Sequence, residues 1–195
     1  MQANTDQHLI EQTLQGDSRA YGTLVDRYKD YVFTIVLRMV KVREEAEEVA
    51  QDTFIKAYES LASFRGESKF SSWLYSIAYR KALDCLRKQK RTRTSELLED
   101  ITEGDGSMVE NALVQMERQE RSSAIRRGIM ELPEIEAGLV SMYYYDEMSV
   151  KEISAVTELS EENIKVKLFR SRKKLFNLLG HLVLPETTNS HRKSI

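Results

Sequence analysis

The sequence predicts an all-α fold made of two small helical domains joined by a flexible acidic linker, with a helix-turn-helix in the C-terminal domain. Apolar residues recur at steps of three and four along most of the chain, which is the helical period. The 195 residues include only 8 glycines and 2 prolines, and a chain of many strands and turns needs more of these turn-forming residues. Helical periodicity stops over residues 92–108, where Thr, Ser, Gly and acidic residues are typical of a flexible linker.

Composition argues against several classes of protein. The sequence contains no run of about 18 apolar residues, so it predicts no transmembrane helix. The N-terminal residues lack the basic and apolar segments of a secretion signal, and we therefore expect a cytoplasmic protein. A single cysteine, Cys85, excludes an intramolecular disulfide framework, and with three scattered histidines it argues against a structural zinc site. We expect no metal, no cofactor, no catalytic residues and no enzymatic activity.

The first domain is predicted to span residues 1–92 and to contain four helices. A short helix covers 6–15, and Asp17 and Ser18 begin the next, whose apolar residues run from Tyr21 to Met39. The third helix, 43–60, has a stripe of small and apolar residues and several carboxylates in its first half, which suits the positive end of a helix dipole. A loop containing Gly66 precedes an amphipathic helix over about 70–90.

The second domain is predicted over residues 112–182, after an acidic linker over 93–111. A helix near 109–130 is followed by one that begins at Pro133, where the missing N–H costs nothing, and runs to about Tyr145. Ser149 and Glu152 have the spacing of a capping box. Ser160 can cap the last helix, and residues 183–195 resemble a disordered tail.

Charge alternates in blocks. Residues 65–93 contain nine basic and two acidic residues, residues 94–111 contain six acidic and no basic ones, and residues 160–182 contain six basic and two acidic ones. Two basic segments separated by an acidic one favour two separate polyanion-binding surfaces. Ordinary solvated helix faces remain the alternative.

Residues 148–172 have the pattern of a helix-turn-helix: a short capped helix, a tight turn near Thr157-Glu158-Leu159, and a basic helix. In such a unit the second helix enters the major groove of DNA. Because the second helix is the basic one here, the pattern favours DNA binding over a plain helical hairpin.

Aromatic and basic residues interleave over 64–91. Aromatic rings stack on unpaired bases while cations follow the backbone, which is typical of single-stranded nucleic-acid binding. An aromatic stripe at helical spacing is also typical of a core, and both readings can hold. We expect Trp73 and Ile77 to be buried, and the loop aromatics near Phe70 and the basic face to be exposed. The carboxylates of helix 43–60 have no partner histidine and no local base to pair with, and they predict a solvated or partner-facing surface.

Three segments resemble a known family in order and spacing. Residues 47–58 (EEVAQDTFIKAY) are similar to the core-polymerase-binding segment of bacterial sigma factors, and residues 64–78 (FRGESKFSSWLYSIA) to the promoter-melting segment that follows it. Residues 132–175 resemble the C-terminal helix-turn-helix domain. Length, two domains and a short linker match the extracytoplasmic-function (ECF) subfamily of the sigma-70 family.

The resemblance implies a protein that binds core RNA polymerase, recognises a −10 and a −35 promoter element, and opens the DNA. It also implies an anti-sigma factor as partner. The residues implied to bind core polymerase are Glu48, Gln51, Asp52, Phe54 and Tyr58. Those implied at the −10 element are Phe64, Lys69, Phe70, Trp73, Arg80, Lys81, Arg87 and Lys88. Those implied at the −35 element are Asn163, Lys165, Lys167, Phe169, Arg170, Lys173 and Lys174.

The chain departs from the family pattern in the helix-turn-helix. Thr157 stands where the family usually has Leu, Glu158 where it often has Gly, and Glu161-Glu162-Asn163 replaces the usual small residues that open the recognition helix. Two other functions stay open at this point. One is a helix-turn-helix regulator that acts without core polymerase, and the other is a helical adaptor that binds only protein.

Overall fold

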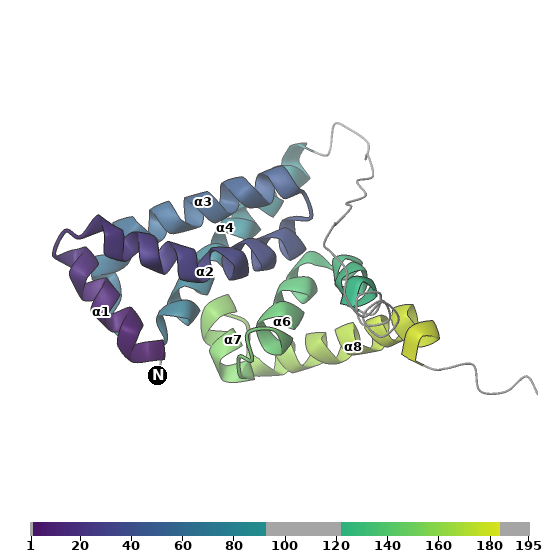
Figure 1. Ribbon diagram of the computed structural model, residues 1–195. Helices are drawn as coiled ribbons and strands as arrows, with labels where there is room; N and C mark the ends of the chain where they lie inside the picture. The colour runs from purple at the N-terminus through teal and green to yellow at the C-terminus, as the bar shows by residue number, and fades with distance from the viewer. Residues whose placement is uncertain (1, 93–121, 184–195) are drawn as a thin grey trace, which may run out of the picture.

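The computed structural model describes residues 2–92 and 122–183, and every regular element in these two ranges is helical (Figure 1). The first range contains α1 (Gln2–Leu14), α2 (Ser18–Val40), α3 (Arg43–Ser60), a short 3-10 helix (Leu61–Ser63) and α4 (Phe70–Thr92). The second begins with a helical stretch over 122–130 and continues with α6 (Glu134–Tyr144), α7 (Val150–Thr157) and α8 (Glu161–Val183). The predicted all-helical fold is confirmed. The expected acidic linker and residues 184–195 of the expected tail lie outside the described residues.

None of the described helices is both long and apolar enough to cross a membrane.

Local side chains and backbone set where the helices begin and end. The Asp17 carboxylate accepts the Arg19 N–H at 2.9 Å and so caps α2. At the other end of α2, Lys41 adopts a left-handed conformation with φ 65°, and its N–H donates to the Leu37 carbonyl. Lys41 thereby ends α2 without a glycine, and α3 starts two residues later with Glu44 and Glu45 in its first turn.

In the N-terminal part, α2 is the central helix and packs against α1, α3 and α4. The predicted apolar stripe of α2 is buried, and Val32 and Val36 are fully inaccessible. Small residues on α3, namely Ala46, Ala50 and Ala57, face this stripe and let the two helices approach closely. The helical-period prediction for residues 18–60 is therefore confirmed.

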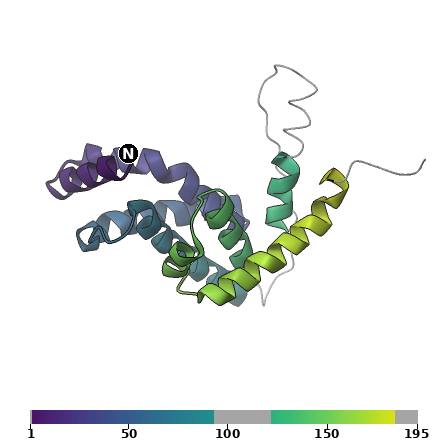
Figure 2. The same cartoon turned by 90° about the horizontal axis from the view of Figure 1, so that it is seen from below.

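In the C-terminal part, α6, α7 and α8 pack around a second group of buried side chains. These are Leu139, Met142, Ile153, Val156, Ile164 and Leu168. The 122–130 stretch lies beside the C-terminal half of α8 (Figure 2). At Gly128 an added Cβ would lie 3.2 Å from a methyl carbon of Leu175, so this glycine allows the close approach.

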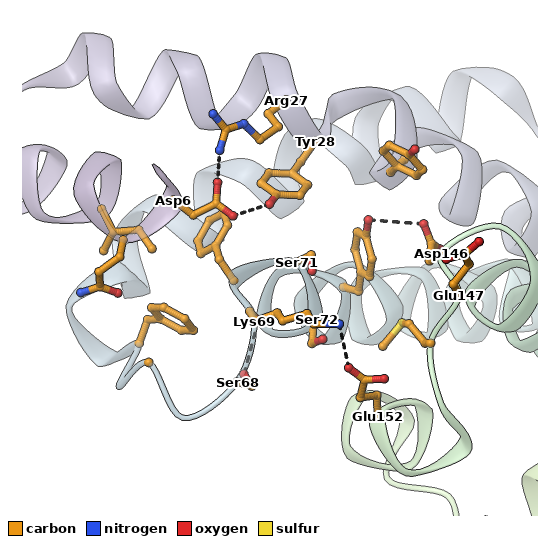
Figure 3. Close-up of a pocket in the computed structure, with 18 of the residues that line it drawn as sticks. Asp6, Arg27, Tyr28, Ser68, Lys69, Ser71, Ser72, Asp146, Glu147 and Glu152 are labelled. Atoms are coloured by element: carbon orange, nitrogen blue, oxygen red, sulfur yellow. Dashed lines mark hydrogen bonds and ion pairs between the residues drawn. The ribbon is translucent and has the colours of Figure 1, made fainter. Parts of the chain in front are cut away.

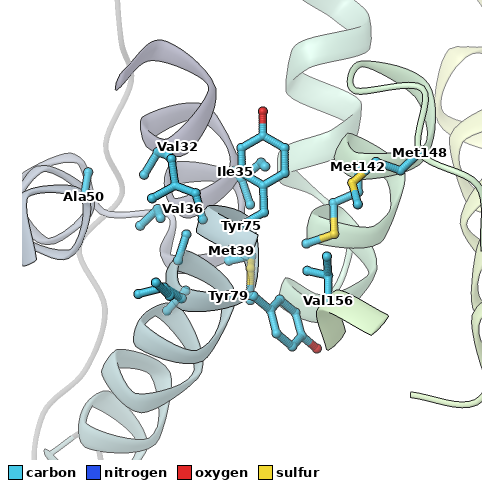
Figure 4. Packing of buried hydrophobic residues seen from close by; sticks show 14 of the residues in the cluster. Val32, Ile35, Val36, Met39, Ala50, Tyr75, Tyr79, Met142, Met148 and Val156 are labelled. Carbon is cyan, nitrogen blue, oxygen red and sulfur yellow. The ribbon is translucent and has the colours of Figure 1, made fainter. Parts of the chain in front are cut away.

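The two parts of the chain pack against each other and share one apolar core, which the sequence does not indicate. Helix α6 lies on α2, and α7 lies on α4. Met39, Tyr75 and Tyr79 from the N-terminal part meet side chains of α6 and α7 in this contact (Figure 4). At Gly138 an added Cβ would lie 3.0 Å from the sulfur of Met39. Periodicity shows that a helix face is buried but does not show against which partner.

Polar groups at the C-terminal end of α2 reinforce this contact. The Arg38 side chain is buried, donates to the Ser141 hydroxyl at 2.9 Å, and lies over the Tyr145 ring at 4.0 Å. Lys41 donates through Nζ to the Leu132 carbonyl at 2.8 Å. A buried guanidinium that is bonded and stacked in this way fixes the register between α2 and α6.

Candidate nucleic-acid interface

The loop over residues 64–69 brings an aromatic cluster to the start of α4. Gly66 has φ 73°, a conformation that favours glycine, and turns the chain back toward the helix. The Phe64 ring lies 5.7 Å from the Phe70 ring and 5.4 Å from the Trp73 ring, centroid to centroid. Tyr28 of α2 packs on Phe70 from the other side at 5.6 Å. These tilted and edge-to-face contacts hold the loop against the helical core.

Phe70 is buried, so the expectation that it lies exposed on the loop is wrong. Its side chain is only 4% exposed, because it is the first residue of α4 and its ring points into the cluster. Trp73, expected in the core, is half-buried instead, whereas Ile77 is buried as expected. Phe64, Trp73 and Tyr28 are thus half-buried rings of this cluster, and Phe70 is its buried ring.

Cations line the same face, from the loop along α4. Lys69 and Arg87 expose 71% and 69% of their side chains. Arg87 pairs with Asp84 at 2.8 Å, one turn away on the same helix. Arg80 and Arg87 are seven residues apart and therefore lie on one side of α4. The aromatic cluster and this row of cations together form a continuous polar and aromatic face of the N-terminal part.

A cavity of about 780 Å³ opens beside the loop, between the two parts of the chain (Figure 3). Its floor is polar: Asp6 accepts hydrogen bonds from Arg27 and from the Tyr28 hydroxyl. Burial, and then the bond to Asp6, raise the pKa of Tyr28 above its usual range. Lys69 crosses the rim of the cavity and meets Glu152 of α7 at 3.2 Å.

The α6–α7 connection closes the cavity on the other side. The carboxylate of Asp146 accepts from the Tyr75 hydroxyl at 3.5 Å. Burial raises the pKa of Asp146 to about 6, although the Tyr75 hydrogen bond and the nearby Arg38 charge favour the ionised form. Burial also raises the pKa of Tyr75. This connection therefore places a carboxyl group with a raised pKa between the two parts of the chain.

Helices α7 and α8 form a capped helix-turn-helix, as predicted. The Ser149 hydroxyl accepts the Glu152 N–H at 3.2 Å, and the Glu152 carboxylate accepts the Ser149 N–H at 2.9 Å. The Ser149 hydroxyl also donates to the Glu152 carboxylate at 2.8 Å. The two bonds that this carboxylate accepts from Ser149 are the main reason why the pKa of Glu152 is lowered, with Lys69 adding a smaller effect. Glu158 ends α7 in a left-handed conformation with φ 61°. Ser160 caps α8 by accepting the Asn163 N–H at 3.3 Å.

Helix α8 turns one side to the core and a basic side outward. Ile164 and Leu168 are buried, while Phe169 is 67% exposed and Arg170 is exposed. The −35 residues named from the sequence are exposed or half-buried, as DNA contact requires: Asn163, Lys165, Lys167, Phe169, Arg170, Lys173 and Lys174. Lys174 donates to the Glu131 carbonyl and is thereby held toward the start of α6.

Helix α3 presents a mixed acidic and apolar face away from α2. Glu48, Gln51 and Asp52 are exposed, as expected for a partner-facing surface. The expectation that its carboxylates lack a nearby base is wrong for Asp52, which pairs with Lys81 of α4 at 3.0 Å. Sequence spacing hid this pair because the two residues lie on different helices. The pair also joins a residue of the core-binding set to one of the −10 set.

Two exposed apolar residues extend this face of α3. Tyr58 is 50% exposed and stacks edge-on against Tyr21 at 4.9 Å, and Ile55 is 58% exposed. Phe54 is half-buried, and its carbonyl accepts the Tyr21 hydroxyl. The exposure of Ile55 makes it a candidate contact residue that sequence reasoning did not name. Its spacing could have indicated this, because Ile55 lies four residues after Gln51 and three before Tyr58 and so shares their face of α3 rather than the buried one.

Comparison with known proteins identifies the family. The family model described as Sigma-70 region 2 matches residues 24–92, and the one described as Sigma-70, region 4 matches residues 122–175. The ECF RNA polymerase sigma factor SigW of Bacillus subtilis is 34% identical over 182 residues, which cover 89% of this chain and 96% of the relative. The chain belongs to the ECF sigma factors of the sigma-70 family. The RNA polymerase sigma-H factor of Pseudomonas aeruginosa is 32% identical over 91% of this chain and 95% of the relative.

Solved structures share the fold of this sigma factor. RpoE of Bartonella quintana, solved in complex with the anti-sigma factor NepR, aligns with a TM-score of 0.68 and 18% identity over 83% of this chain and 97% of that one. CnrH, solved in complex with the cytosolic domain of CnrY, aligns with a TM-score of 0.63 and 23% identity over 90% of this chain and 97% of that one.

The matched regions divide the sequence-predicted residues in a simple way. Region 2 contains both the core-binding and the −10 sets, and region 4 contains the −35 set. The structure brings Lys69 and Arg80 of region 2 together with acidic residues of region 4, which no sequence pattern indicated. Among the described residues, no group of three or more His, Cys, Asp or Glu is placed to hold a metal ion.

Proposed function

We propose that this sigma factor binds core RNA polymerase, directs it to promoters with particular −10 and −35 elements, and promotes DNA opening at the start of transcription. The observation that carries the proposal is the presence of regions 2 and 4 in order in one chain, with a capped helix-turn-helix whose second helix turns its cations outward. Its place of action is the cytoplasm, where bacterial RNA polymerase works, and its role is binding rather than catalysis.

In region 4 we propose that α8 reads the −35 element in the major groove. Asn163, Lys167 and Arg170 occupy the N-terminal half of the helix, the half that meets base edges in helix-turn-helix docking. Arg170 suits bidentate contact to guanine. Phe169 is exposed beside it and can meet a thymine methyl group. Lys165 lies in the same N-terminal half as Lys167. Lys173 and Lys174 lie farther along the helix and suit phosphate contacts, which position the helix without reading sequence.

In region 2 we propose that the loop and α4 bind the unpaired −10 strand. Phe64 and Trp73 are accessible enough to stack on a base, and Lys69, Arg80 and Arg87 supply charge for the phosphates. Lys81 and Lys88 directly follow Arg80 and Arg87 on α4 and add two further positive charges beside them. Phe70 supports this site from within, because its buried ring holds the loop against Tyr28.

We propose that the exposed face of α3 binds core polymerase, with Glu48, Gln51 and Asp52 as polar contacts. Ile55 joins Tyr58 as an apolar contact, and Phe54 supports the helix. We propose domain boundaries of 1–92 and 112–182, with residues 93–111 as linker; the matched regions, 24–92 and 122–175, fall within these two domains. The two solved relatives were captured with protein partners, which supports an anti-sigma factor as a further partner.

Run-off transcription with purified bacterial core polymerase tests the proposal. The template is a pool with randomised −35 and −10 elements, and transcripts are sequenced with and without this chain. We expect the chain to enrich one pair of elements at a fixed spacing. Binding of one duplex motif that needs no polymerase, together with unchanged transcription, would identify a regulator instead, and no effect on DNA or polymerase would identify an adaptor.

A charge reversal on α3 tests the polymerase contact separately. Glu48→Lys is expected to weaken core binding without changing helical content, because Glu48 is exposed in mid-helix. Glu11→Lys on α1 is the matched control, since it makes the same charge change away from α3. Equal core affinity of the two variants would remove α3 from the polymerase interface.

A further inference from the structure

In the free protein, region 4 contacts region 2 through two ion pairs on the proposed −10 surface. Glu152 of α7 pairs with Lys69 at 3.2 Å, and Glu158 at the end of α7 pairs with Arg80 at 2.8 Å. Both cations belong to the set proposed to bind the −10 strand, and the two acids come from the first helix of the helix-turn-helix and from the residue that ends it. The carboxylates thus lie where phosphates of the strand are proposed to lie.

Apolar packing places α7 at this position. Val156, on α7, is 2% exposed and packs with Met39 and Tyr79 in the shared core (Figure 4). Exposed ion pairs alone contribute little to stability. The apolar contact therefore holds α7 in place, and the ion pairs make its charge complementary to that of Lys69 and Arg80. Charge complementarity of this kind selects the binding partner more than it strengthens binding.

The backbone at Glu158 points to a role for its side chain. Its φ of 61° is the left-handed conformation that ends helices, for which glycine is the favoured residue. Glu158 carries the conformational cost of that turn, and its carboxylate reaches Arg80 on the neighbouring region. A glycine would satisfy the turn but could not make this contact.

We propose that α7 is a built-in competitor of promoter DNA: Glu152 and Glu158 substitute for two phosphates at Lys69 and Arg80, so that region 2 of the free protein is closed to single-stranded DNA until region 4 moves away. The proposal rests on the proposed function, because it takes Lys69 and Arg80 as part of the −10 surface. The occupant is a segment of the same chain, so the competition needs no other protein.

Two substitutions remove the carboxylates without harming the fold. Glu158→Gly suits the left-handed turn, and Glu152→Gln keeps a residue that can complete the capping box with Ser149. Glu147→Gly is the matched control for the first, since Glu147 is exposed with φ 51° and its carboxylate lies beside Asp146 rather than at Lys69 (Figure 3). Glu131→Gln is the control for the second, as an exposed region 4 acid outside α7.

The measurement is the affinity of the free, full-length chain for a random-sequence, 5′-labelled single-stranded oligonucleotide of about 20 nucleotides, by fluorescence anisotropy. Two exposed ion pairs shift an equilibrium by roughly 2- to 30-fold, so we expect the Glu152→Gln, Glu158→Gly variant to bind tighter by a factor in that range. Two phosphate contacts regained should steepen the salt dependence by about 1.4 units of slope.

Adding Lys69→Ala and Arg80→Ala to that variant is expected to abolish the gain, which separates region 2 from the cations of α8. The proposal is overturned if the Glu152→Gln, Glu158→Gly variant binds like the unaltered chain, if the two control substitutions produce the same gain, or if the gain survives loss of Lys69 and Arg80. The run-off assay distinguishes the two failures: a chain that initiates transcription but shows no gain keeps its proposed function and loses this competitor.

Discussion

Phe70 shows how a single aromatic residue can be placed in the correct segment and given the wrong environment. The sequence places it where a loop rich in basic and aromatic residues meets the following helix, a position at which an exposed ring would stack on DNA. The structure places it at the first position of α4, packed between Tyr28 and Trp73. Which way a residue points at a helix start depends on the loop path, and Gly66 sets that path here.

The burial of Phe70 predicts a loss of stability on truncation. Phe70→Ala should lower the free energy of unfolding by about 3–5 kcal/mol, the usual cost of deleting a buried aromatic ring. Urea unfolding followed by circular dichroism measures this, with the half-buried Phe64→Ala as a comparison expected to cost less. A stable Phe70→Ala protein that fails only in promoter opening would show that the ring acts on DNA directly.

Asp146 predicts a pH dependence of folding. Burial raises its pKa from 3.8 to about 6, so the folded chain holds this proton more tightly than the unfolded chain does. Its contribution to stability is therefore fully present below pH 4 and is lost as the pH rises through about 6. Asp146→Asn should remove that part of the profile and raise stability at pH 7 relative to the unaltered chain.

Unfolding midpoints of both proteins between pH 4 and pH 8 check this prediction. Asn retains an oxygen that can accept from the Tyr75 hydroxyl, and Arg38 is unchanged, so the substitution isolates the carboxyl proton. Parallel profiles for the two proteins would show that Asp146 titrates alike in the folded and unfolded states.

At the scale of elements, the sequence predicted most of the fold, because helix signals are local. The apolar period located α2, α3 and α4, and Asp17, Ser149 and Ser160 marked helix starts that the structure confirms. Contacts between elements were not predictable in this way. The pairing of Asp52 with Lys81 joins residues 29 positions apart, and only the packing of α3 on α4 brings them together.

Helix α8 predicts two separable classes of substitution. Arg170→Ala should relax base preference at one −35 position, because a bidentate contact to guanine is worth about 1–3 kcal/mol of discrimination. Lys173→Ala should weaken binding to all −35 sequences alike and flatten the salt dependence by about one unit of slope. Lys173 is preferred to Lys174 here because Lys174 also bonds the Glu131 carbonyl.

Binding of both variants to a library of −35 duplexes gives the comparison. If Arg170→Ala lowers affinity uniformly across the library, Arg170 contacts phosphate and another residue of α8 reads the base.

For the whole molecule, the main feature that the sequence did not reveal is the contact between regions 2 and 4. Met39, Tyr75 and Tyr79 lie on apolar faces that periodicity marks as buried, and a four-helix domain alone could have covered them. The structure covers them with α6 and α7 instead. Charge patterning likewise identified basic surfaces but could not show that Glu152 and Glu158 lie on one of them.

A reversible crosslink between the two regions predicts loss of promoter use. The position for a Gly138 Cβ lies 3.1 Å from Cγ of Met39, which brings the two Cβ atoms within reach of a disulfide. Met39→Cys with Gly138→Cys, in a Cys85→Ser background, should block run-off transcription when oxidised and restore it on reduction. The reduced protein is its own control for the substitutions.

Insensitivity of Cys85→Ser alone to the reductant would confirm that the effect comes from the crosslink. Full initiation by the oxidised protein would show that regions 2 and 4 need not separate on the promoter.

Gly138 links the secondary structure of α6 to the assembly of the molecule. Glycine inside a helix costs about 0.5–1 kcal/mol relative to alanine, and α6 carries that cost at the point where Met39 approaches. One extra methyl group would strengthen α6 as a helix and at the same time push against the sulfur of Met39. Helix propensity and interdomain docking thus favour different residues at this position. Alanine would stabilise α6 within region 4, whereas glycine lets α6 approach Met39 of region 2.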